Sequence, residues 1–268
     1  MKIGSKEFDF TSHCYVMGIL NVTPDSFSDG GKWNNLDAAL RHTEEMIADG
    51  CDILDIGGES TRPGYTLLTD QEEIDRVLPV IEAVKARFDI PVSLDTYKSK
   101  VAQAGVDAGI DLINDIWGCK YDPEMAAVMG KSGLPVCLMH NRKEPVYNDY
   151  LPDVLEDLRE CVRIAKAGGV QDSQIILDPG IGFGKTYEHN LQLMNHVELL
   201  LELGYPVLLG TSRKSMIGLT LNLPAPERVE GTLVTTVMGV MKGCGIVRVH
   251  DVKENKRAIA MTEKLLQY

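Results

Sequence analysis

The sequence predicts an α/β fold, a single-domain (β/α)8 TIM barrel with its active site at the C-terminal ends of the strands. Eight short apolar runs recur along the chain, most of them ending in a polar or charged residue, and helical patterns lie between them. The 268 residues, 44% of them hydrophobic, can bury one large core. This length is close to the ~250 residues typical of such barrels. We therefore expect residues 1–268 to form one domain.

The eight apolar runs are expected to be the strands of the barrel. A parallel strand covered by helices can be apolar throughout, so a polar residue at its carboxyl end points out of the core toward a shared site. The residues that close the runs are Asn21, Asp55, Asp95, Asn114, His140, Asp178, Gly210 and His250. We expect these strand ends to carry the function.

Helical patterns occupy the stretches between the runs. Apolar residues keep a 3.6-residue period over 36–47, 74–84 and 151–162. Thr69 and Glu72 have the spacing of a capping box before the second of these helices. Further helices are predicted over 99–108, 123–131, 189–203, 226–241 and 251–266, the last with Asp251 as its N-cap.

Charge and composition restrict the partners and the compartment. The formal net charge of −12 repels polyanions, so neither nucleic acid nor an anionic membrane is an expected partner. No apolar stretch approaches the ~20 residues that span a bilayer, and the polar start lacks a signal-peptide core, so we expect a cytoplasmic protein. The six cysteines form no CxxC pair and are expected to be buried free thiols.

The loops after the first two runs are long and chemically rich. Residues 21–31 and 57–64 combine glycine and proline with polar and charged side chains. Glycine permits backbone conformations closed to other residues and proline stiffens a turn, so such loops can move and still adopt one defined form. We interpret them as lids that carry Phe27, Asp29 and Arg62, with solvated connectors as the alternative.

Five segments together resemble the dihydropteroate synthase family: residues 21–31, 59–64, 178–186, 210–215 and 248–252. The resemblance implies a (β/α)8 transferase that joins 6-hydroxymethyl-7,8-dihydropterin pyrophosphate to p-aminobenzoate. The products are 7,8-dihydropteroate, for folate biosynthesis, and pyrophosphate. The resemblance also implies a homodimer and sulfonamides as competitors. Departures from the family pattern at Asn141, Trp117 and Tyr65 are expected to alter the shape of the pocket without removing a charged group.

Polar strand ends suit the edge of a pterin, which carries an amino group and a ring N–H beside acceptors. A carboxylate such as Asp95 or Asp178 can accept two parallel hydrogen bonds from that edge. The amide of Asn114 can pair with a donor and an acceptor at once, and Lys214 can donate to the acceptor side. A capped helix or a buried hydrogen bond is the structural alternative for each group. The resemblance assigns these same four positions to pterin binding, with Met139 packing beside the ring.

The pyrophosphate leaving group requires positive charge. Arg248 and His250 lie two apart on one predicted strand and share a face, and Arg62 comes from the second loop, so the three are expected to form an anion clamp. The family resemblance implies that Asn21 binds Mg2+ together with pyrophosphate. One protein ligand is compatible with a hydrated Mg2+ that takes its other oxygens from the substrate.

The predicted mechanism is an SN1-like substitution at the pterin methylene carbon. Carbon–oxygen cleavage leaves a cation delocalised into the pterin, which Asp95, Asp178 and Asp29 would favour, while the clamp and Mg2+ favour the departing anion. Lys214 completes the set of predicted catalytic residues. Ser212 lacks the G-x-S-x-G elbow, which argues against a serine hydrolase.

The second substrate brings an aromatic ring and a carboxylate. Phe27, Pro63 and Phe183 are expected to enclose the ring, and Ser215 to receive the carboxylate. The resemblance adds Thr61 to this set.

Two alternatives to the synthase remain open at this stage. A cobalamin-dependent methyltransferase domain that binds methyltetrahydrofolate shares the barrel and the pterin-binding strand ends. A catalytically silent pterin-binding barrel is the non-enzyme alternative. The two loop motifs and the anion clamp favour the synthase over both.

Overall fold

The structure is a computed structural model that describes residues 1–22, 32–59 and 67–268. Eight parallel strands form one sheet in the order β8-β7-β6-β5-β4-β3-β10-β9. Their bounds are β3 Tyr15–Asn21, β4 Ile53–Gly57, β5 Val92–Asp95, β6 Leu112–Asp115, β7 Val136–Met139, β8 Ile175–Asp178, β9 Leu208–Leu209 and β10 Ile246–Val249. A parallel bridge between Leu177 of β8 and Val207, just before β9, closes the sheet into a barrel. The predicted fold class is confirmed.

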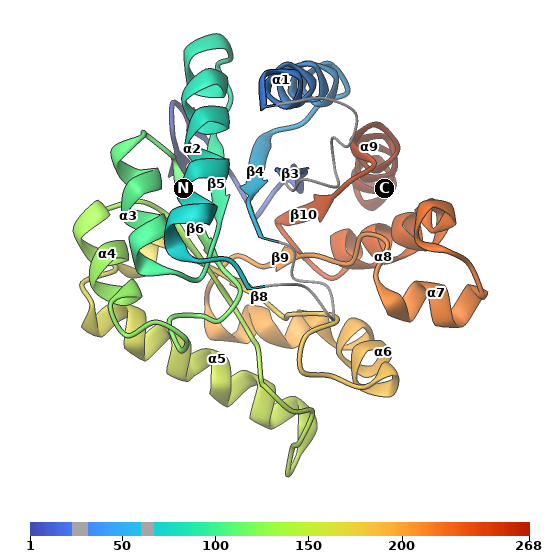
Figure 1. The fold of residues 1–268 in the computed structure, drawn as a ribbon. Helices are drawn as coiled ribbons and strands as arrows, with labels where there is room; N and C mark the ends of the chain where they lie inside the picture. The colour runs from blue at the N-terminus through green and yellow to red at the C-terminus, as the bar shows by residue number, and fades with distance from the viewer. Residues whose placement is uncertain (23–31, 60–66) are drawn as a thin grey trace.

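Helices surround the strands in a ring (Figure 1). Their bounds are α1 Lys32–Ala48, α2 Asp70–Arg87, α3 Ser99–Asp107, α4 Met125–Ser132, α5 Tyr150–Ala167, α6 Tyr187–Asn195, α7 Ser215–Leu221, α8 Val229–Met241 and α9 Val252–Leu266. Short 3-10 segments are η2 Asp172–Gln174, η3 Val197–Leu203 and η4 Ala225–Glu227. None of the described helices is both long and apolar enough to cross a membrane.

The side chains of the strands alternate between two cores. One set faces outward against the helices, for example Leu54, Leu94 and Leu138. The other set fills the lower barrel interior, where Met17 and Ile53 belong to an apolar cluster. Inward-pointing residues further along the same strands are polar, so the carboxyl end of the barrel interior is where a site can form.

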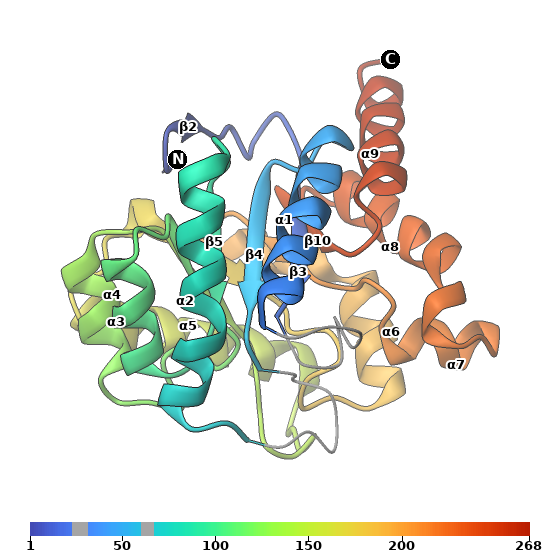
Figure 2. The same ribbon diagram turned by 45° about the horizontal axis from the view of Figure 1, so that its top comes forward.

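An N-terminal hairpin that the sequence analysis did not predict covers the other end of the barrel. Strands β1 (Lys2–Ile3) and β2 (Lys6–Glu7) pair antiparallel. Ile3 and Phe8 are buried in the cluster at the bottom of the interior. Figure 2 shows the hairpin at the end of the barrel where α9 finishes. The hairpin therefore closes the amino end and leaves the carboxyl end for function.

Local predictions are confirmed in part. Thr69 caps α2 with the predicted capping box, since Glu72 N donates to Thr69 Oγ1 and Thr69 N donates to Glu72 Oε2. All six cysteines are free and buried. The helix predicted over 189–203 is instead two elements, α6 and η3, because the backbone leaves helical geometry at His196.

Two further helix predictions need correction. The helix predicted over 226–241 begins only at Val229, after the short segment η4 that contains Pro226. Asp251 occupies the N-cap position of α9, but its side chain makes no capping hydrogen bond. Its carboxylate instead accepts from Arg213 Nε at 3.1 Å and Nη2 at 2.5 Å. The charge-assisted pair takes the oxygens that a cap would have used.

Candidate active site

Four strand ends lie at one level of the barrel interior. The register joins Asn21 to Gly57, Gly57 to Asp95, and Asp95 to Asn114 on successive strands. A Cβ added to Gly57 would lie 3.6 Å from Asp95 Cβ and 3.7 Å from Asn21 Oδ1. The missing side chain at Gly57 therefore leaves room between two predicted substrate-binding residues.

Arg248 crosses this level and connects the predicted groups. Its Nε donates to Asp55 Oδ2 and its Nη2 to Asp95 Oδ2, both at 2.6 Å. Asp55 is fully buried and also accepts from Ser93 Oγ at 2.5 Å and Asn114 Nδ2 at 3.3 Å. The predicted pyrophosphate ligand Arg248 and the predicted pterin ligands Asp95 and Asn114 thus belong to one hydrogen-bonded network, called the inner network below.

The sequence analysis missed the part of Asp55 in this network. Asp55 closes the second apolar run, which was a signal for function, but no local pattern shows its partner. Arg248 is 193 positions away and is brought to Asp55 only by closure of the barrel. Alternation along β4 places Asp55 on the face of Gly57, which is the inward face.

Burial shifts the pKa values of the charged groups around the mouth. Burial raises the pKa of Asp95 to about 7, with Arg248 acting in the opposite direction, and raises the pKa of Asp178 to about 6. Burial and the charge of Arg248 lower the pKa of Lys214 to about 8, although Asp178 and Asp95 oppose this shift. The charge of Lys214 acts on both Asp95 and Asp178, as expected for predicted pterin ligands gathered at the barrel mouth.

An apolar wall borders these charged groups. Tyr97, Ile116 and Met139 form a small buried cluster, and Trp117 and Phe183 pack against it. Phe183 is only half-buried, and Lys214 Nζ lies 4.0 Å from the centre of its ring. A flat apolar surface beside carboxylates and an ammonium suits a planar heterocycle with a polar edge.

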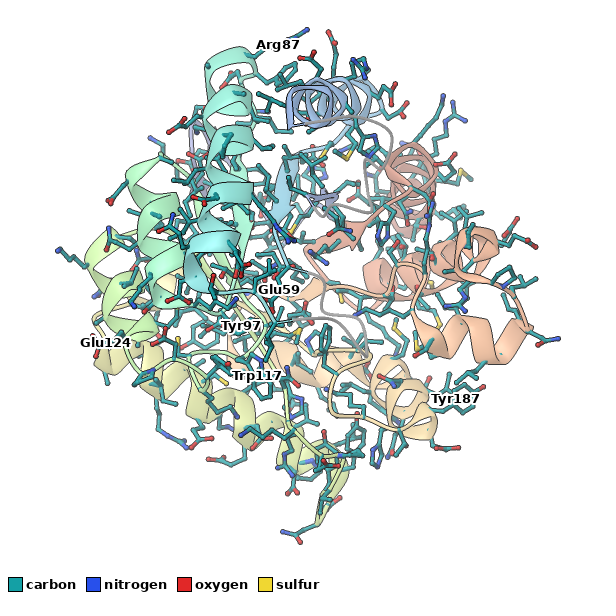
Figure 3. The ribbon with its side chains drawn as sticks, in the orientation of Figure 1. Glu59, Arg87, Tyr97, Trp117, Glu124 and Tyr187 are labelled. Atoms are coloured by element: carbon teal, nitrogen blue, oxygen red, sulfur yellow. The ribbon has the colours of Figure 1, made fainter. Side chains whose placement is uncertain are left out.

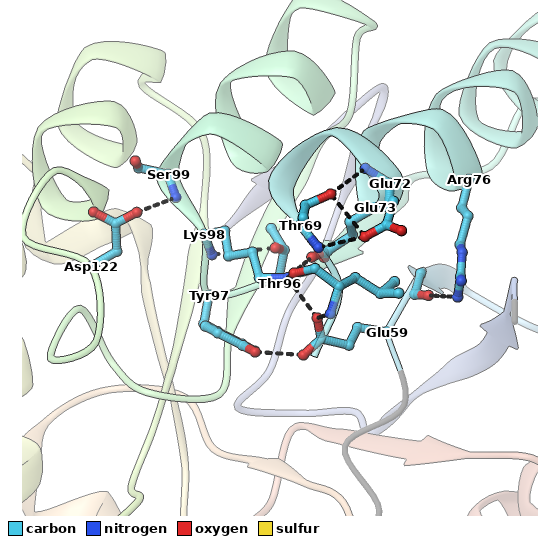
Figure 4. Close-up of polar contacts among 12 residues, drawn as sticks. Glu59, Thr69, Glu72, Glu73, Arg76, Thr96, Tyr97, Lys98, Ser99 and Asp122 are labelled. Carbon is cyan, nitrogen blue, oxygen red and sulfur yellow. Dashed lines mark hydrogen bonds and ion pairs between the residues drawn. The ribbon is translucent and has the colours of Figure 1, made fainter. Parts of the chain in front are cut away.

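A second polar cluster fastens the end of β4 to the start of α3 (Figure 4). Glu59 accepts hydrogen bonds from Tyr97 Oη and Lys98 Nζ, both at 2.5 Å, and from the backbone N–H of Leu68 at 3.1 Å. Lys98 Nζ also reaches Leu68 O at 2.9 Å and Glu73 Oε2 at 2.8 Å. Figure 3 shows Tyr97 between Glu59 and Trp117, so this cluster adjoins the apolar wall.

His250 is oriented by Ser212. Ser212 Oγ lies 2.9 Å from His250 Nδ1 and accepts from the backbone N–H of His250 at 3.1 Å. With the hydroxyl proton donated to Nδ1, the ring carries its own proton on Nε2 and presents a donor there. Ser212 thus serves His250, and the sequence argument against a serine nucleophile is consistent with this geometry.

The segment carrying Lys214 is held from the outside. Arg213 has a left-handed backbone, with φ of 57°. Thr232 Oγ1 accepts from Arg213 N at 3.1 Å, and Arg228 Nη1 donates to Arg213 O at 2.9 Å. Ser215 begins α7 and is exposed. These contacts fix the backbone from which the Lys214 side chain enters the site.

The described chain contains ten of the predicted site residues and not the others. Phe27, Asp29, Thr61, Arg62 and Pro63 lie outside the described residues, as does Tyr65. Trp117 borders the apolar wall, and Asn141 Nδ2 donates to Ile116 O at 3.1 Å. Among the described residues there is no group of three or more His, Cys, Asp and Glu that could hold a metal ion.

Comparisons with known proteins show the family to which the chain belongs. Residues 17–250 match the sequence model of the family described as pterin binding enzyme. A dihydropteroate synthase of Clostridium beijerinckii is 62% identical over 268 residues, covering 100% of both chains. A dihydropteroate synthase of Bacillus subtilis is 58% identical over 251 residues, covering 94% of this chain and 88% of its own.

Solved structures are similar over nearly the whole chain. A dihydropteroate synthase from Clostridium difficile, in the presence of pteroic acid, has a TM-score of 0.95 at 47% identity and covers 98% of this chain and 100% of its own. One from Yersinia pestis with a sulfonamide drug has a TM-score of 0.94 at 44% identity, with 100% and 99% covered. One from Xanthomonas albilineans with 4-aminobenzoic acid has a TM-score of 0.92 at 40% identity, with 96% and 95% covered.

Proposed function

The chain belongs to the pterin-binding enzyme family and, within it, to the dihydropteroate synthases, and we propose a division of that reaction among its strand-end residues. The enzyme is a transferase that joins 6-hydroxymethyl-7,8-dihydropterin pyrophosphate to p-aminobenzoate and releases pyrophosphate. The observation that carries the proposal is that Asp95 and Asp178 close strands of one sheet, with Lys214 Nζ over the Phe183 ring of the apolar wall.

The pterin lies on the apolar wall in this proposal. Met139 packs against the ring, and Asp178 accepts from the amino group and the ring N–H at the pterin edge. Asn114 and Asp95 contact the other polar positions, and Lys214 donates to the acceptor side. Gly210 supports this placement, because a Cβ there would lie 3.6 Å from Asp178 Oδ2 and its absence leaves that oxygen accessible.

Cleavage of the methylene carbon–oxygen bond is stabilised electrostatically. The bond breaks with both electrons leaving on the pyrophosphate oxygen, and the cation left on the methylene carbon is delocalised into the pterin. Asp95 and Asp178 favour that cation, and Asp29 is proposed to join them from outside the described residues. The amine of p-aminobenzoate then attacks the carbon and loses a proton. No covalent enzyme intermediate is needed, because the preorganised charges at the mouth of the barrel lower the activation barrier for bond cleavage.

Arg248, His250 and Arg62 are proposed to bind the pyrophosphate. Two donor positions of Arg248 already contact Asp55 and Asp95, so its remaining N–H groups are the ones that can meet the anion. The Nε2 proton assigned to His250 gives a second donor. Arg62 belongs to the segment that the structure does not describe.

Mg2+ is proposed as the cofactor, with Asn21 Oδ1 as its protein ligand. Asn21 fits such an ion because it supplies a neutral oxygen at the strand end, beside the open position at Gly57. When bound, the ion would supply positive charge to the departing pyrophosphate. Removal of divalent metal with a chelator should abolish turnover, and added Mg2+ should restore it.

p-Aminobenzoate is proposed to bind against Phe183, with its carboxylate at Ser215. Both residues adjoin Lys214. The Phe183 ring lies 4.0 Å from Lys214 Nζ, and Ser215 is the next residue in the sequence. Phe27, Thr61 and Pro63 are proposed to complete this pocket. A sulfonamide shares the aniline ring and a polar para substituent, so it should compete for the same space.

One assay tests the whole assignment. Pyrophosphate release should require both p-aminobenzoate and the dihydropterin pyrophosphate, and sulfonamide inhibition should be relieved by added p-aminobenzoate. Steady-state pyrophosphate release at an undiminished rate without p-aminobenzoate would contradict the proposed reaction. A methyltransferase that uses methyltetrahydrofolate would release no pyrophosphate, and a silent barrel would bind pterin without turnover.

We also propose that the enzyme is a cytoplasmic homodimer. Exposed apolar side chains gather on neighbouring helices, with Leu219 and Leu221 on α7 and Val234 and Met241 on α8. Such a surface is more typical of an interface than of solvent. Light scattering should give twice the chain mass of 29.5 kDa, and Val234→Glu should shift the protein toward the monomer.

A further inference from the structure

Lys185 joins both ends of the loop that follows β8. Its Nζ lies 2.7 Å from His140 Nδ1, 2.9 Å from Gly180 O and 2.9 Å from Phe183 O. Burial lowers the pKa of Lys185 to about 7, with the charge of Asp178 opposing this shift. In its ammonium form Nζ has three N–H donors and no acceptor, and these three acceptors match it completely. Lys185 therefore uses its hydrogen bonds on the protein rather than on a substrate.

His140 is held in the tautomer that this contact needs. Its Nε2 lies 2.9 Å from Asp157 Oδ2, which also accepts from Arg142 Nε at 2.6 Å. Burial lowers the pKa of His140 to about 4, so the ring is neutral and Nε2 carries its single proton. Nδ1 is then free of hydrogen and can accept from Lys185. We call Asp157, Arg142, His140 and Lys185 the outer network.

The loop that Lys185 ties is built from glycines with left-handed backbones. Gly180, Gly182 and Gly184 have φ values of 67°, 88° and 54°. A Cβ at Gly180 would lie 1.9 Å from His140 O, so only glycine allows the loop to approach β7 this closely. Such a backbone has many alternative conformations, and a defined one needs fixed contacts.

Phe183 lies at the tip of this loop and faces the site. Its carbonyl is bound to Lys185, while its ring lies against Lys214 Nζ and the apolar wall. Other contacts also hold the loop. Gly182 N donates to Asn190 Oδ1 at 2.6 Å and Tyr147 Oη donates to Gly184 O at 2.7 Å, while Gly180 N donates to Asp178 Oδ1 at 2.6 Å and Phe183 N to Gly180 O at 3.1 Å. Among these side-chain contacts, the one from Lys185 is made directly to the residue that carries the ring.

We propose that Lys185, oriented by His140 and Asp157, is a positioning residue for p-aminobenzoate: it fixes the 180–184 backbone so that the Phe183 ring faces that substrate. The inference rests on the proposed placement of p-aminobenzoate against Phe183. The backbone of Asp178 is held in β8 by the sheet, and its Oδ1 accepts from Gly180 N at 2.6 Å. The pterin edge therefore has support besides the loop and should depend less on Lys185 than the Phe183 ring does.

The test compares Lys185→Met with a matched control, Lys166→Met, in the full chain. Lys166 carries the same side chain, but its ammonium pairs with Asp172 at the surface. Lys185→Met should raise the KM for p-aminobenzoate about tenfold or more and change the KM for the pterin substrate by less than about threefold. Lys166→Met should change neither. Equal losses for both substrates, or an unchanged KM for p-aminobenzoate, would overturn the proposal.

A second variant keeps the test decisive if Lys185→Met does not fold. His140→Phe keeps a ring of similar size and removes both nitrogens, leaving Lys185 with two carbonyl acceptors. It should raise the KM for p-aminobenzoate about threefold and spare pterin affinity, measured by calorimetry. Unchanged kinetics in a folded His140→Phe protein would contradict the part assigned to the outer network.

Phe183→Leu separates failure of this inference from failure of the proposed function. If Phe183→Leu leaves the KM for p-aminobenzoate unchanged, the placement of that substrate is wrong. If Phe183→Leu raises it and Lys185→Met does not, only the positioning role is wrong. In the double variant the two effects should be less than multiplicative, because both changes act through the same ring.

Discussion

Two buried charge networks flank the mouth of the barrel, and they differ in direction. The inner network, built around Arg248 and Asp55, points into the barrel, where the strand-end side chains face the substrates. The outer network, built around His140 and Lys185, lies on the far side of β7 against α5. Met139 and His140 are neighbours in the chain, yet one borders the apolar wall and the other belongs to the outer network.

The difference shows how strand alternation separates chemistry from support. Inward residues such as Asp95 retain hydrogen-bonding capacity for a substrate, and burial raises the pKa of that carboxyl to about 7. Outward residues bond only to the protein in the contacts described, and they reach the substrate through backbone atoms. Changes inside should therefore affect pterin recognition, and changes outside should affect p-aminobenzoate.

The largest effect should come from removing the cation of the inner network. Arg248→Met leaves Asp55 and Asp95 buried near each other without their shared partner. Breaking a buried pair in this way costs about 3–5 kcal/mol of folding free energy. Urea denaturation should report this loss, and pyrophosphate release should fall with it. Adding Asp55→Asn to Arg248→Met should recover part of the stability, and no recovery would mean that Arg248 acts independently of Asp55.

The next effect should come from the pterin edge. Asp178→Ala removes an acceptor aimed at donors that become buried on binding, and this should cost about 2–4 kcal/mol of transition-state stabilisation. The measurement is kcat/KM for the pterin substrate. In Asp95→Ala, more of the loss in kcat/KM should appear in kcat if Asp95 also stabilises the cation. A change in KM alone would show that Asp95 contributes only to ground-state binding of the pterin. Activity retained in Asp178→Ala would refute the assignment.

Sequence patterns identified Arg248, Asp95 and Asn114 as site residues, but not the part of Asp55 in the inner network or the connections within it. Asp95, Asn114 and Asp178 were predictable because each closes an apolar run, and their inward direction follows from alternation. The pair between Arg248 and Asp55 depends on closure of the barrel, which brings β10 beside β3. No local spacing encodes that contact.

The outer network was less predictable for a different reason. His140 closes a run and was visible as a candidate, but the family resemblance gave it no role. Lys185 lies in the recognised 178–186 segment, where glycines attract attention first. Its function depends on the three acceptors gathered by the loop, and this arrangement exists only once Gly180 lies against His140. The hairpin of residues 2–7 escaped prediction because strands of two residues carry no periodic signal.

Acidification should distinguish the two networks. The pterin edge needs ionised acceptors, so protonation of Asp95 near pH 7 and of Asp178 near pH 6 should weaken binding as pH falls. Below both values, affinity should drop about tenfold per pH unit for each proton that must be released. Calorimetry with the dihydropterin lacking pyrophosphate avoids titration of the phosphates. A flat affinity between pH 5 and 8 would show that neither carboxyl controls binding.

Stability should respond to pH with opposite signs at the carboxyls of the barrel mouth and in the outer network. The raised pKa values of Asp95 and Asp178 let the folded state bind more protons than the unfolded state, so their contribution to stability decreases as pH rises through 4 to 7. The lowered pKa of His140 has the opposite effect, since the unfolded state binds the proton between about pH 4 and 6.5. Its contribution is present above pH 6.5 and is lost on acidification. Between pH 6.5 and 4, the free energy of unfolding should therefore decrease less in His140→Phe than in the parent protein.

The smallest effects should come from single hydroxyl groups, one in each region. Ser93→Ala removes the hydroxyl that donates to Asp55, and Tyr147→Phe removes the hydroxyl that donates to Gly184 O. Each variant loses one hydrogen bond, so each should cost about 1 kcal/mol of stability in thermal or urea unfolding.

The kinetic effects of Ser93→Ala and Tyr147→Phe should differ although their stability losses are alike. Ser93→Ala releases one constraint on Asp55 and hence on Arg248 and Asn114, so it should raise the KM for the pterin substrate. Tyr147→Phe loosens the loop that carries Phe183, so it should raise the KM for p-aminobenzoate. The same substrate affected in both variants would mean that the two networks act as one.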